Sequence, residues 1–293
     1  MHLGHQKIIQ EARDWARNNK GETVVITFKS HPKAVLSGRP LNFITSLEHK
    51  LVLLQRQGVD IILVFDFKEV AELRAEDFIR QVVGMLGTKG WVMGINSHFG
   101  KNREGDFSLA SRLSQYYGYQ LRVCPPVNYK GDIISSTRIR TAILAGDLEE
   151  AEGMLGRPVS VLGTVVRGSG RGKSLGYPTA NLDLQQEIRP PSGVYATWVT
   201  LHGKDYLSLT SIGTRPTFEG EGKETSEVYI INFDRDLYGE VLEVKFIYKL
   251  REELKFASAE ALKAQMDKDK EEVLRKPGKN TLTKGSTKTI ISA

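Results

Sequence analysis

The sequence predicts an α/β domain with a parallel sheet, followed by a small antiparallel β-barrel with one C-terminal helix. In the first half of the 293 residues, apolar strands alternate with amphipathic helices, as they do in parallel sheets with right-handed crossovers. In the second half, strands follow one another at short spacing, which is typical of small antiparallel barrels. The hydrophobic content of 40% is that of a folded protein with one large or two ordinary domains.

The chain is basic, with a formal charge of +6 and an isoelectric point of about 9.2. This excess suits anionic small substrates, and because no basic stripe or known motif stands out we expect no nucleic-acid partner. The single cysteine, Cys124, excludes a disulfide framework. No apolar run approaches the ~18 residues of a membrane span. We therefore expect a cytoplasmic protein without signal peptide or membrane partner, and leave a homo-oligomer open.

The first half begins with a helix that ends near Gly21. The strand that follows, Thr23–Phe28, is continuously apolar, as strands buried on both faces of a parallel sheet are. Further strands are predicted at Val59–Phe65, Gly90–Gly94 and Gln120–Val123, and further helices at Ser46–Gln57, Ala75–Leu86 and Ser108–Tyr117. The segment Asp147–Leu155 is expected to help close the first domain. Loops after the carboxyl ends of such strands are where ligands bind.

The second half is predicted to be mostly β-strand. The strands are expected at Val159–Val166, Gly193–Leu201, Tyr206–Ile212, Glu227–Phe233 and Val241–Tyr248. Gly203 and Lys204 are interpreted as a hairpin turn, Gly213–Phe218 as a loop, and the last two strands as a hairpin around Leu237–Gly239. One helix, at about Ser258–Leu274, follows the strands, with Leu262 and Met266 on its apolar face.

Three segments follow from these elements. We expect a first domain at residues 1–156, a second at 157–276, and a flexible tail at 277–293. Gly156-Arg157-Pro158 is the expected linker between the domains. Pro277 ends the last helical pattern, and the tail after it is rich in Lys, Thr, Ser and Gly.

Glycine and basic residues alternate in the stretch Gly163–Asn181, GTVVRGSGRGKSLGYPTAN. Glycines permit positive φ and close backbone approach, and consecutive N–H groups with basic side chains can hold phosphate. Thr179 and Asn181 offer neutral oxygens on one side of an extended segment, which suit a Mg2+ ion that also binds phosphate. The stretch therefore predicts a nucleoside-triphosphate site with a metal; a mobile basic surface loop is the alternative.

Two motifs in the first half also suit phosphate binding. His2 and His5, in HLGH at a helix start, can hold the phosphates of ATP, although exposed surface histidines are the alternative. Ser136, Thr137 and Arg140 combine two hydroxyls and a guanidinium at the start of a later helix. An ordinary helix cap is the alternative for this second group.

Taken in this order, the motifs resemble those of a known family. HLGH and SSTRIR are similar to the two signature motifs of nucleotidylyltransferases, and the stretch ending in PTAN resembles the signature of riboflavin kinase. Apart from its termini, the chain resembles the bacterial bifunctional riboflavin kinase/FAD synthetase family from end to end. The resemblance implies a Rossmann-like nucleotidylyltransferase sheet before the barrel. It also implies ATP-dependent phosphorylation of riboflavin to FMN and adenylylation of FMN to FAD, with Mg2+.

The resemblance also assigns roles in the kinase half. Glu227 matches the catalytic glutamate, which accepts the proton of the riboflavin hydroxyl; an exposed edge-strand glutamate is the alternative. Arg251 matches a residue near the flavin, and a solvated charge is the alternative. The resemblance implies that Thr179 and Asn181 are the metal ligands. The ATP-binding residues would be Gly168, Gly170, Arg171, Lys173 and Gly176.

In the adenylyltransferase half, the residues expected to bind ATP or FMN are His2, His5, His31, Asn96, Ser136, Thr137 and Arg140. The sequence departs from the family pattern at Ser30 (usually proline), Ser97 (usually aromatic) and Glu252 (usually aspartate). The family also places a strand and a turn before HLGH, whereas this sequence begins at HLGH itself. We therefore expect a sheet that lacks its first strand.

Two alternative functions are left open. The first is riboflavin kinase activity alone, with the adenylyltransferase domain impaired by loss of that strand. The second is a non-catalytic flavin- or RNA-binding protein that uses the basic loop and tail, against which the complete PTAN motif and Glu227 argue.

Overall fold

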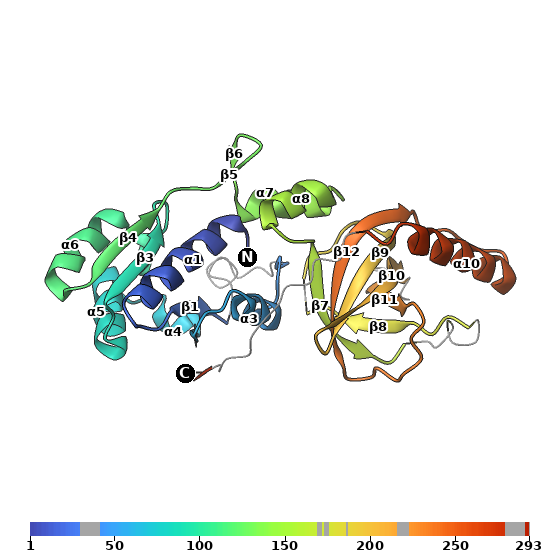
Figure 1. The fold of residues 1–293 in the computed structure, drawn as a ribbon, viewed down its shortest axis with the longest axis horizontal. Coiled ribbons are helices and arrows are strands. Elements are labelled where there is room, and N and C mark those ends of the chain that lie inside the picture. Colours follow the sequence, from blue (N-terminus) through green and yellow to red (C-terminus); the bar gives the residue numbers. More distant parts are fainter. Residues whose placement is uncertain are drawn as a thin grey trace. The chain divides into compact units, whose positions relative to one another are not determined.

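The computed structural model describes residues 1–29, 42–168, 172, 176–185, 187–215, 223–278 and 291–292. It forms two compact units: Met1–Leu41 with Leu47–Ser135 and Thr283–Ala293, and Asn42–Ser46 with Ser136–Leu282. Each unit has its own sheet and core and is described by itself (Figure 1). The expected domain limits at residues 156 and 276 stay predictions.

The first unit contains two pairs of parallel strands and the long helix α1 (Leu3–Asn18). β1 (Val24–Phe28) pairs with β2 (Ile61–Phe65), and β3 (Gly90–Gly94) pairs with β4 (Gln120–Cys124). The remaining elements before residue 136 are α3 (Leu47–Arg56), α4 (Phe67–Val70), α5 (Ala75–Leu86), η1 (Lys101–Arg103), α6 (Phe107–Tyr117), β5 (Asn128–Tyr129) and β6 (Asp132–Ile133). The α/β class and the order of its elements are therefore confirmed.

The parallel sheet is in two pieces. Among the described residues β1 pairs only with β2, and β3 only with β4, so one edge of each lacks a strand partner. A third strand from the chain's end, β13 (Ile291–Ser292), pairs with the other edge of β2. The predicted flexible tail thus contributes two residues to this sheet.

Helix α1 contacts both pieces of the sheet through apolar side chains. Ile9 belongs to one core, together with Leu54 of α3 and Ile62 of β2. On the other piece, the indole of Trp15 occupies the space where a side chain at Gly90 would lie. Helix α1 is therefore fixed by packing against both pieces of the sheet.

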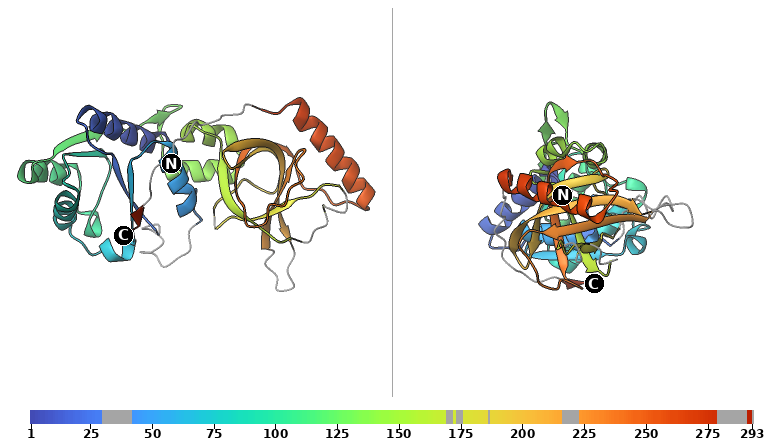
Figure 2. Two further views of the ribbon diagram at one scale, coloured as in Figure 1. Left: turned by 60° about the horizontal axis from the view of Figure 1, so that its bottom comes forward. Right: turned by 90° about the vertical axis from the view of Figure 1, so that its right-hand side faces the viewer.

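The second unit is built around a closed barrel of six strands, in the order β10-β11-β8-β7-β12-β9 (Figure 2). Before the barrel lie α7 (Ser136–Leu144) and α8 (Leu148–Leu155), and after it lies α10 (Ala259–Arg275). The strands are β7 (Ser160–Val166), β8 (Ala180–Asp183), β9 (Gly193–Leu201), β10 (Lys204–Arg215), β11 (Lys223–Ile230) and β12 (Val241–Arg251). The predicted antiparallel barrel and C-terminal helix are confirmed.

One predicted pairing is wrong, because β11 and β12 do not form a hairpin. β11 lies between β10 and β8, and β12 lies between β7 and β9. The connection between β11 and β12 reaches β7, where the Gly239 amide donates to the Val165 carbonyl (3.0 Å). This long connection allows β7 and β8 to lie between the two strands and close the ring.

Two smaller predictions also change. β10 continues to Arg215, so Gly213 belongs to a strand rather than to a loop. The β9–β10 turn consists of His202 and Gly203, with φ of 47° and 76°, while Lys204 already pairs with Leu201. Positive φ at both turn residues gives the twist that a two-residue hairpin requires.

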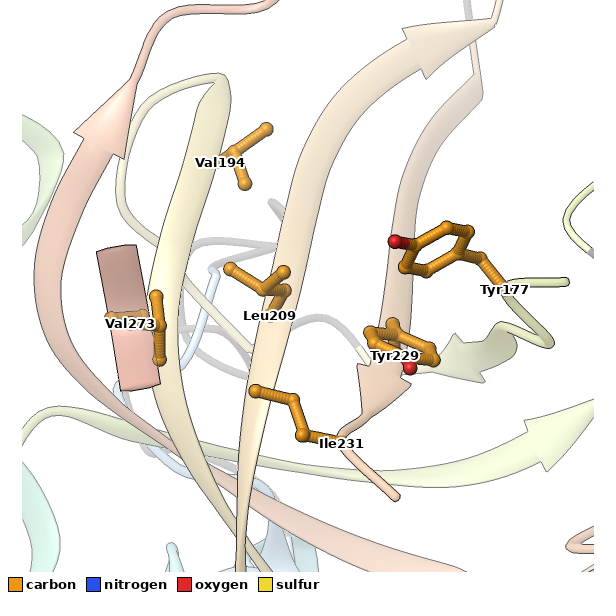
Figure 3. Packing of buried hydrophobic residues seen from close by; sticks show 7 residues of the cluster. Tyr177, Val194, Leu209, Tyr229, Ile231 and Val273 are labelled. Carbon is orange, nitrogen blue, oxygen red and sulfur yellow. The ribbon is translucent and has the colours of Figure 1, made fainter. Parts of the chain in front are cut away.

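Helix α10 covers part of the outer face of the barrel (Figures 2 and 3). Val273 of α10 is fully buried in a cluster with Val194, Leu209 and Tyr229, and Met266 packs at its side as the sequence predicted. The opposite side of β9 faces the barrel interior and is equally buried, for example at Tyr195. Both faces of β9 are therefore largely buried, which fits a strand that has no charged residue.

Candidate active sites

The pairing of β8 with β11 brings the predicted kinase residues together. Glu227 is the cross-strand partner of Asn181, so both side chains point to the same face of the barrel wall. Thr179, which precedes β8, donates through Oγ1 to Oε2 of Glu227 (3.4 Å). All three residues are half-buried. Two neutral oxygens and one carboxylate thus share a site that solvent and a ligand can reach.

Two described glycines of the preceding loop, Gly168 and Gly172, lie directly against this group. A Cβ atom at Gly168 would overlap the amide of Asn181, and one at Gly172 would overlap the Tyr177 carbonyl and approach the Thr179 hydroxyl at 3.2 Å. Gly176 has φ of 82°, which favours glycine. Close approach of the loop backbone therefore requires these glycines. Gly170, Arg171 and Lys173 lie outside the described residues.

The guanidinium of Arg251, which was expected to lie near the flavin, is bonded to other residues of the protein. Its Nε and Nη2 donate to the Asp269 carboxylate of α10 (2.8–3.0 Å), and its Nη1 donates to the Glu252 carbonyl (3.0 Å). The Asp269 side chain is only 5% exposed. The bidentate pair therefore ties the end of β12 to α10, and a flavin contact by Arg251 stays a prediction.

Two aromatic residues at this site were missed by sequence reasoning. Tyr177 is buried against Tyr229 with ring centroids 4.9 Å apart, and its hydroxyl donates to Asp267 of α10. Tyr238 is exposed, and the Arg167 guanidinium lies 6.0 Å from its ring centre, beside Gly168. The only available signal was their position: Tyr177 directly precedes PTAN, and Tyr238 occupies the turn between β11 and β12.

In the first unit, His2 and His5 lie together at the start of α1. Their rings are 3.8 Å apart, and the His2 amide donates to Nδ1 of His5 (3.4 Å). His2 is half-buried, whereas His5 is exposed to solvent, as the alternative had it. Partial desolvation lowers the pKa of His2 to about 4, and desolvation together with the charge of His2 lowers the pKa of His5 to about 3. Nδ1 of His2 is buried without a hydrogen-bond partner in the part of the chain that the structure describes. Two neutral imidazoles at a helix N-terminus are thus available to an anionic ligand.

The other predicted residues of this half are distributed over both units. Asn96 is exposed in the turn after β3, where the Ser97 amide donates to the Gly94 carbonyl (2.9 Å). Ile8 of α1 lies close to Gly94, so Asn96 and the start of α1 occupy the same end of β3. His31 lies outside the described residues.

Ser136, Thr137 and Arg140 lie in the first two turns of α7, which belongs to the second unit. Ser136 and Thr137 are exposed, and Arg140 is half-buried. Exposed hydroxyls at a helix start can donate to a phosphate group. Ser136, Thr137 and Arg140 thus belong to the second unit, whereas His2 and His5 belong to the first.

The fold and the two groups of residues define a two-domain transferase that uses a nucleotide. Comparison with known proteins gives the family. The FAD synthetase family model matches residues 1–138, and the riboflavin kinase family model matches residues 155–276. The chain therefore belongs to the bifunctional riboflavin kinase/FMN adenylyltransferase family, as the motifs indicated.

Relatives that match nearly the whole chain belong to the same family. The bifunctional riboflavin kinase/FMN adenylyltransferase of Listeria monocytogenes is 36% identical over 276 residues, covering 93% of this chain and 88% of the relative. The Bacillus subtilis protein of the same name is 35% identical, covering 94% and 89%. The Escherichia coli K12 protein is 34% identical, covering 92% and 87%.

A solved structure shares the whole fold. It is a Streptococcus pneumoniae protein titled as a macrolide-efflux protein, 35% identical, with a TM-score of 0.78 over 94% of this chain and 90% of that one. In the described part of this chain, no helix combines the length and apolar character needed to cross a membrane.

We predict that Gly168→Ala destabilises the second unit by about 1–2 kcal/mol, because the added methyl group must displace Asn181. Urea unfolding followed by fluorescence measures this change. Asn181→Ala removes the obstructing amide, so the double variant should lose clearly less stability than the sum of the two single variants. Strict additivity would contradict the contact.

We predict that both imidazoles stay neutral down to the pKa values of about 4 for His2 and about 3 for His5. The unfolded chain binds these protons near pH 6.5, so the first unit should lose stability as pH falls from 6.5 toward 4. NMR titration of ring protons measures both pKa values, with His2→Gln and His5→Gln used for assignment. The urea-unfolded chain is the control, and titration of the folded protein near 6.5 would contradict desolvation of the two rings.

Proposed function

We propose that this chain phosphorylates riboflavin with ATP to give FMN, and then transfers the adenylyl group of a second ATP to FMN to give FAD. The observation that carries the first step is the position of Glu227 opposite Asn181, with the Thr179 hydroxyl 3.4 Å from its carboxylate. Membership of the bifunctional family supports both steps.

In the kinase step, Glu227 accepts the proton of the terminal ribityl hydroxyl. The hydroxyl oxygen then forms a bond to the γ-phosphorus of ATP as the bond to the bridging oxygen breaks and ADP leaves. Phosphoryl transfer depends mainly on positioning and on neutralisation of charge. The half-buried setting of Glu227 keeps the carboxylate accessible to substrate, while the glycines let the loop backbone approach the phosphates closely.

Mg2+ is the metal that suits the kinase site. Thr179 and Asn181 provide neutral oxygen atoms, the ligand type that Mg2+ accepts while it also holds phosphate oxygens and water. When bound, the ion would neutralise negative charge on the phosphates. The protein's part is to hold these two oxygens beside Glu227, and the β8–β11 register does so.

In the adenylyl-transfer step, a phosphate oxygen of FMN attacks the α-phosphorus of ATP, and pyrophosphate leaves. This step needs orientation and charge stabilisation rather than a protein nucleophile. His2 and His5 would contact the ATP phosphates at the start of α1, with Asn96, Ser136, Thr137 and Arg140 as further ligands. The buried Nδ1 of His2, which lacks a described partner, fits this role.

Riboflavin, FMN and ATP are thus the proposed partners, and the cytoplasm, where ATP is supplied, is the proposed location. One observation favours kinase activity alone as a second candidate. The edges of β1 and β3 lack strand partners among the described residues, which leaves the sheet beneath the adenylyl-transfer site in two pieces. Measuring both products on one preparation distinguishes the two candidates.

We predict that Glu227→Gln lowers the rate of FMN formation by about 10²–10⁴-fold, because the amide cannot accept the proton. Formation of FAD from added FMN should continue at the unchanged rate, which shows that the chain is folded. Glu240→Gln, at an exposed glutamate just before β12, is the matched control. FMN synthesis at the normal rate in Glu227→Gln would exclude Glu227 as the base.

The reverse result is expected for His5→Ala. FAD formation from FMN should fall by about 10²–10³-fold through loss of contacts to the phosphates, while FMN formation is retained. His202→Ala removes an exposed histidine of the barrel and should change neither rate. If the unaltered chain forms FMN but no FAD, kinase activity alone is the correct function.

A further inference from the structure

Tyr177 connects the glycine-rich loop to α10. Its hydroxyl donates to Oδ1 of Asp267, and its ring is buried against Tyr229 (Figure 3). Its amide also donates to the Gly172 carbonyl (2.9 Å), so the same residue closes the last turn of the loop. Only Pro178 separates Tyr177 from Thr179. Any displacement of the Tyr177 backbone must therefore move the Thr179 hydroxyl relative to Glu227.

Helix α10 is firmly anchored at this point. Asp269 holds Arg251 at the end of β12, and Val273 is fully buried on the barrel wall. Asp267 lies between these anchors and the N-terminal half of the helix, with Lys263 one turn earlier contacting its second oxygen (3.1 Å). A carboxylate on an anchored helix is a fixed acceptor, so it can define the position of the Tyr177 side chain that bonds to it.

The phenol remains a donor over the whole working range of pH. Burial, together with the hydrogen bond to Asp267, raises the pKa of the Tyr177 hydroxyl above its ordinary value. The same hydrogen bond, together with Lys263, lowers the pKa of Asp267. The donor is thus protonated and the acceptor charged, which is the stronger kind of hydrogen bond.

Assuming the proposed kinase function, we propose that Asp267, through Tyr177, is a positioning residue that holds Thr179 in place for the metal–ATP complex. Neither side chain takes part in the transfer itself. The Tyr177 ring makes the apolar contact with Tyr229, and its hydroxyl makes the bond to Asp267. Tyr177→Phe therefore tests the bond while keeping the packing.

We predict that Tyr177→Phe and Asp267→Ala each raise the Mg2+–ATP concentration for half-maximal FMN formation by about three- to tenfold, the effect of one hydrogen bond whose acceptor is half-exposed. The KM for riboflavin should stay within about twofold, since the bond acts on the loop. The double variant should be no worse than either single variant, because both remove the same bond. Lys263→Ala, which removes the other partner of Asp267, is the matched control and should behave like the unaltered chain.

Formation of FAD from added FMN and the melting temperature of each variant show whether the chain is folded. Asp267 lies near the surface, so its replacement tests the bond even if Tyr177→Phe were to unfold the second unit. Additive effects in the double variant, an unchanged Mg2+–ATP requirement, or a change confined to the riboflavin KM would each overturn the inference. Absence of FMN formation by the unaltered chain would instead contradict the proposed function.

Discussion

The kinase site depends on the antiparallel register between β8 and β11. Only two residue pairs join these strands, and one of them is Asn181 with Glu227. Because successive side chains of a strand point to opposite faces, a shift by one residue would turn the carboxylate away from the two neutral oxygens. The neighbouring ladder of β11 with β10 extends over eight pairs and fixes that register. The short β8 is thus positioned by a strand that the rest of the barrel holds.

Closure of the barrel has a second effect on this site. Glu227, Tyr229 and the residues around them lie on the outer face, while the interior is filled by side chains such as Phe246 and Val199. The residues of the site therefore lie on the outside of the barrel wall. Helix α10 then limits the site on one side through Val273 and the Arg251–Asp269 pair. The residues that pack α10 against the barrel therefore also border the site.

The sequence predicted most elements because their signals are local. The strand Gly193–Leu201 and the helix Ala75–Leu86 have the predicted limits, since hydrophobic period and helix-ending glycine both depend on near neighbours. The wrong hairpin shows the limit of such signals, because the partner of a barrel strand is set by closure and not by its neighbour in sequence. The contact of Thr179 with Glu227 followed from the motif, whereas the bonds of Arg251 and Tyr177 to α10 did not. Those bonds join residues that are 18 and 90 positions apart in the sequence, so no local pattern predicts them.

The two units differ in whether their strands have hydrogen-bonded neighbours on both sides. In the barrel every strand has a neighbour on each side, so its ladder offers no backbone groups to another chain. The first unit carries β1 and β3, each with a row of amides and carbonyls facing no strand among the described residues. Such rows are templates on which a foreign strand can extend the sheet. A strand that paired with either edge would therefore continue the parallel ladder of this unit.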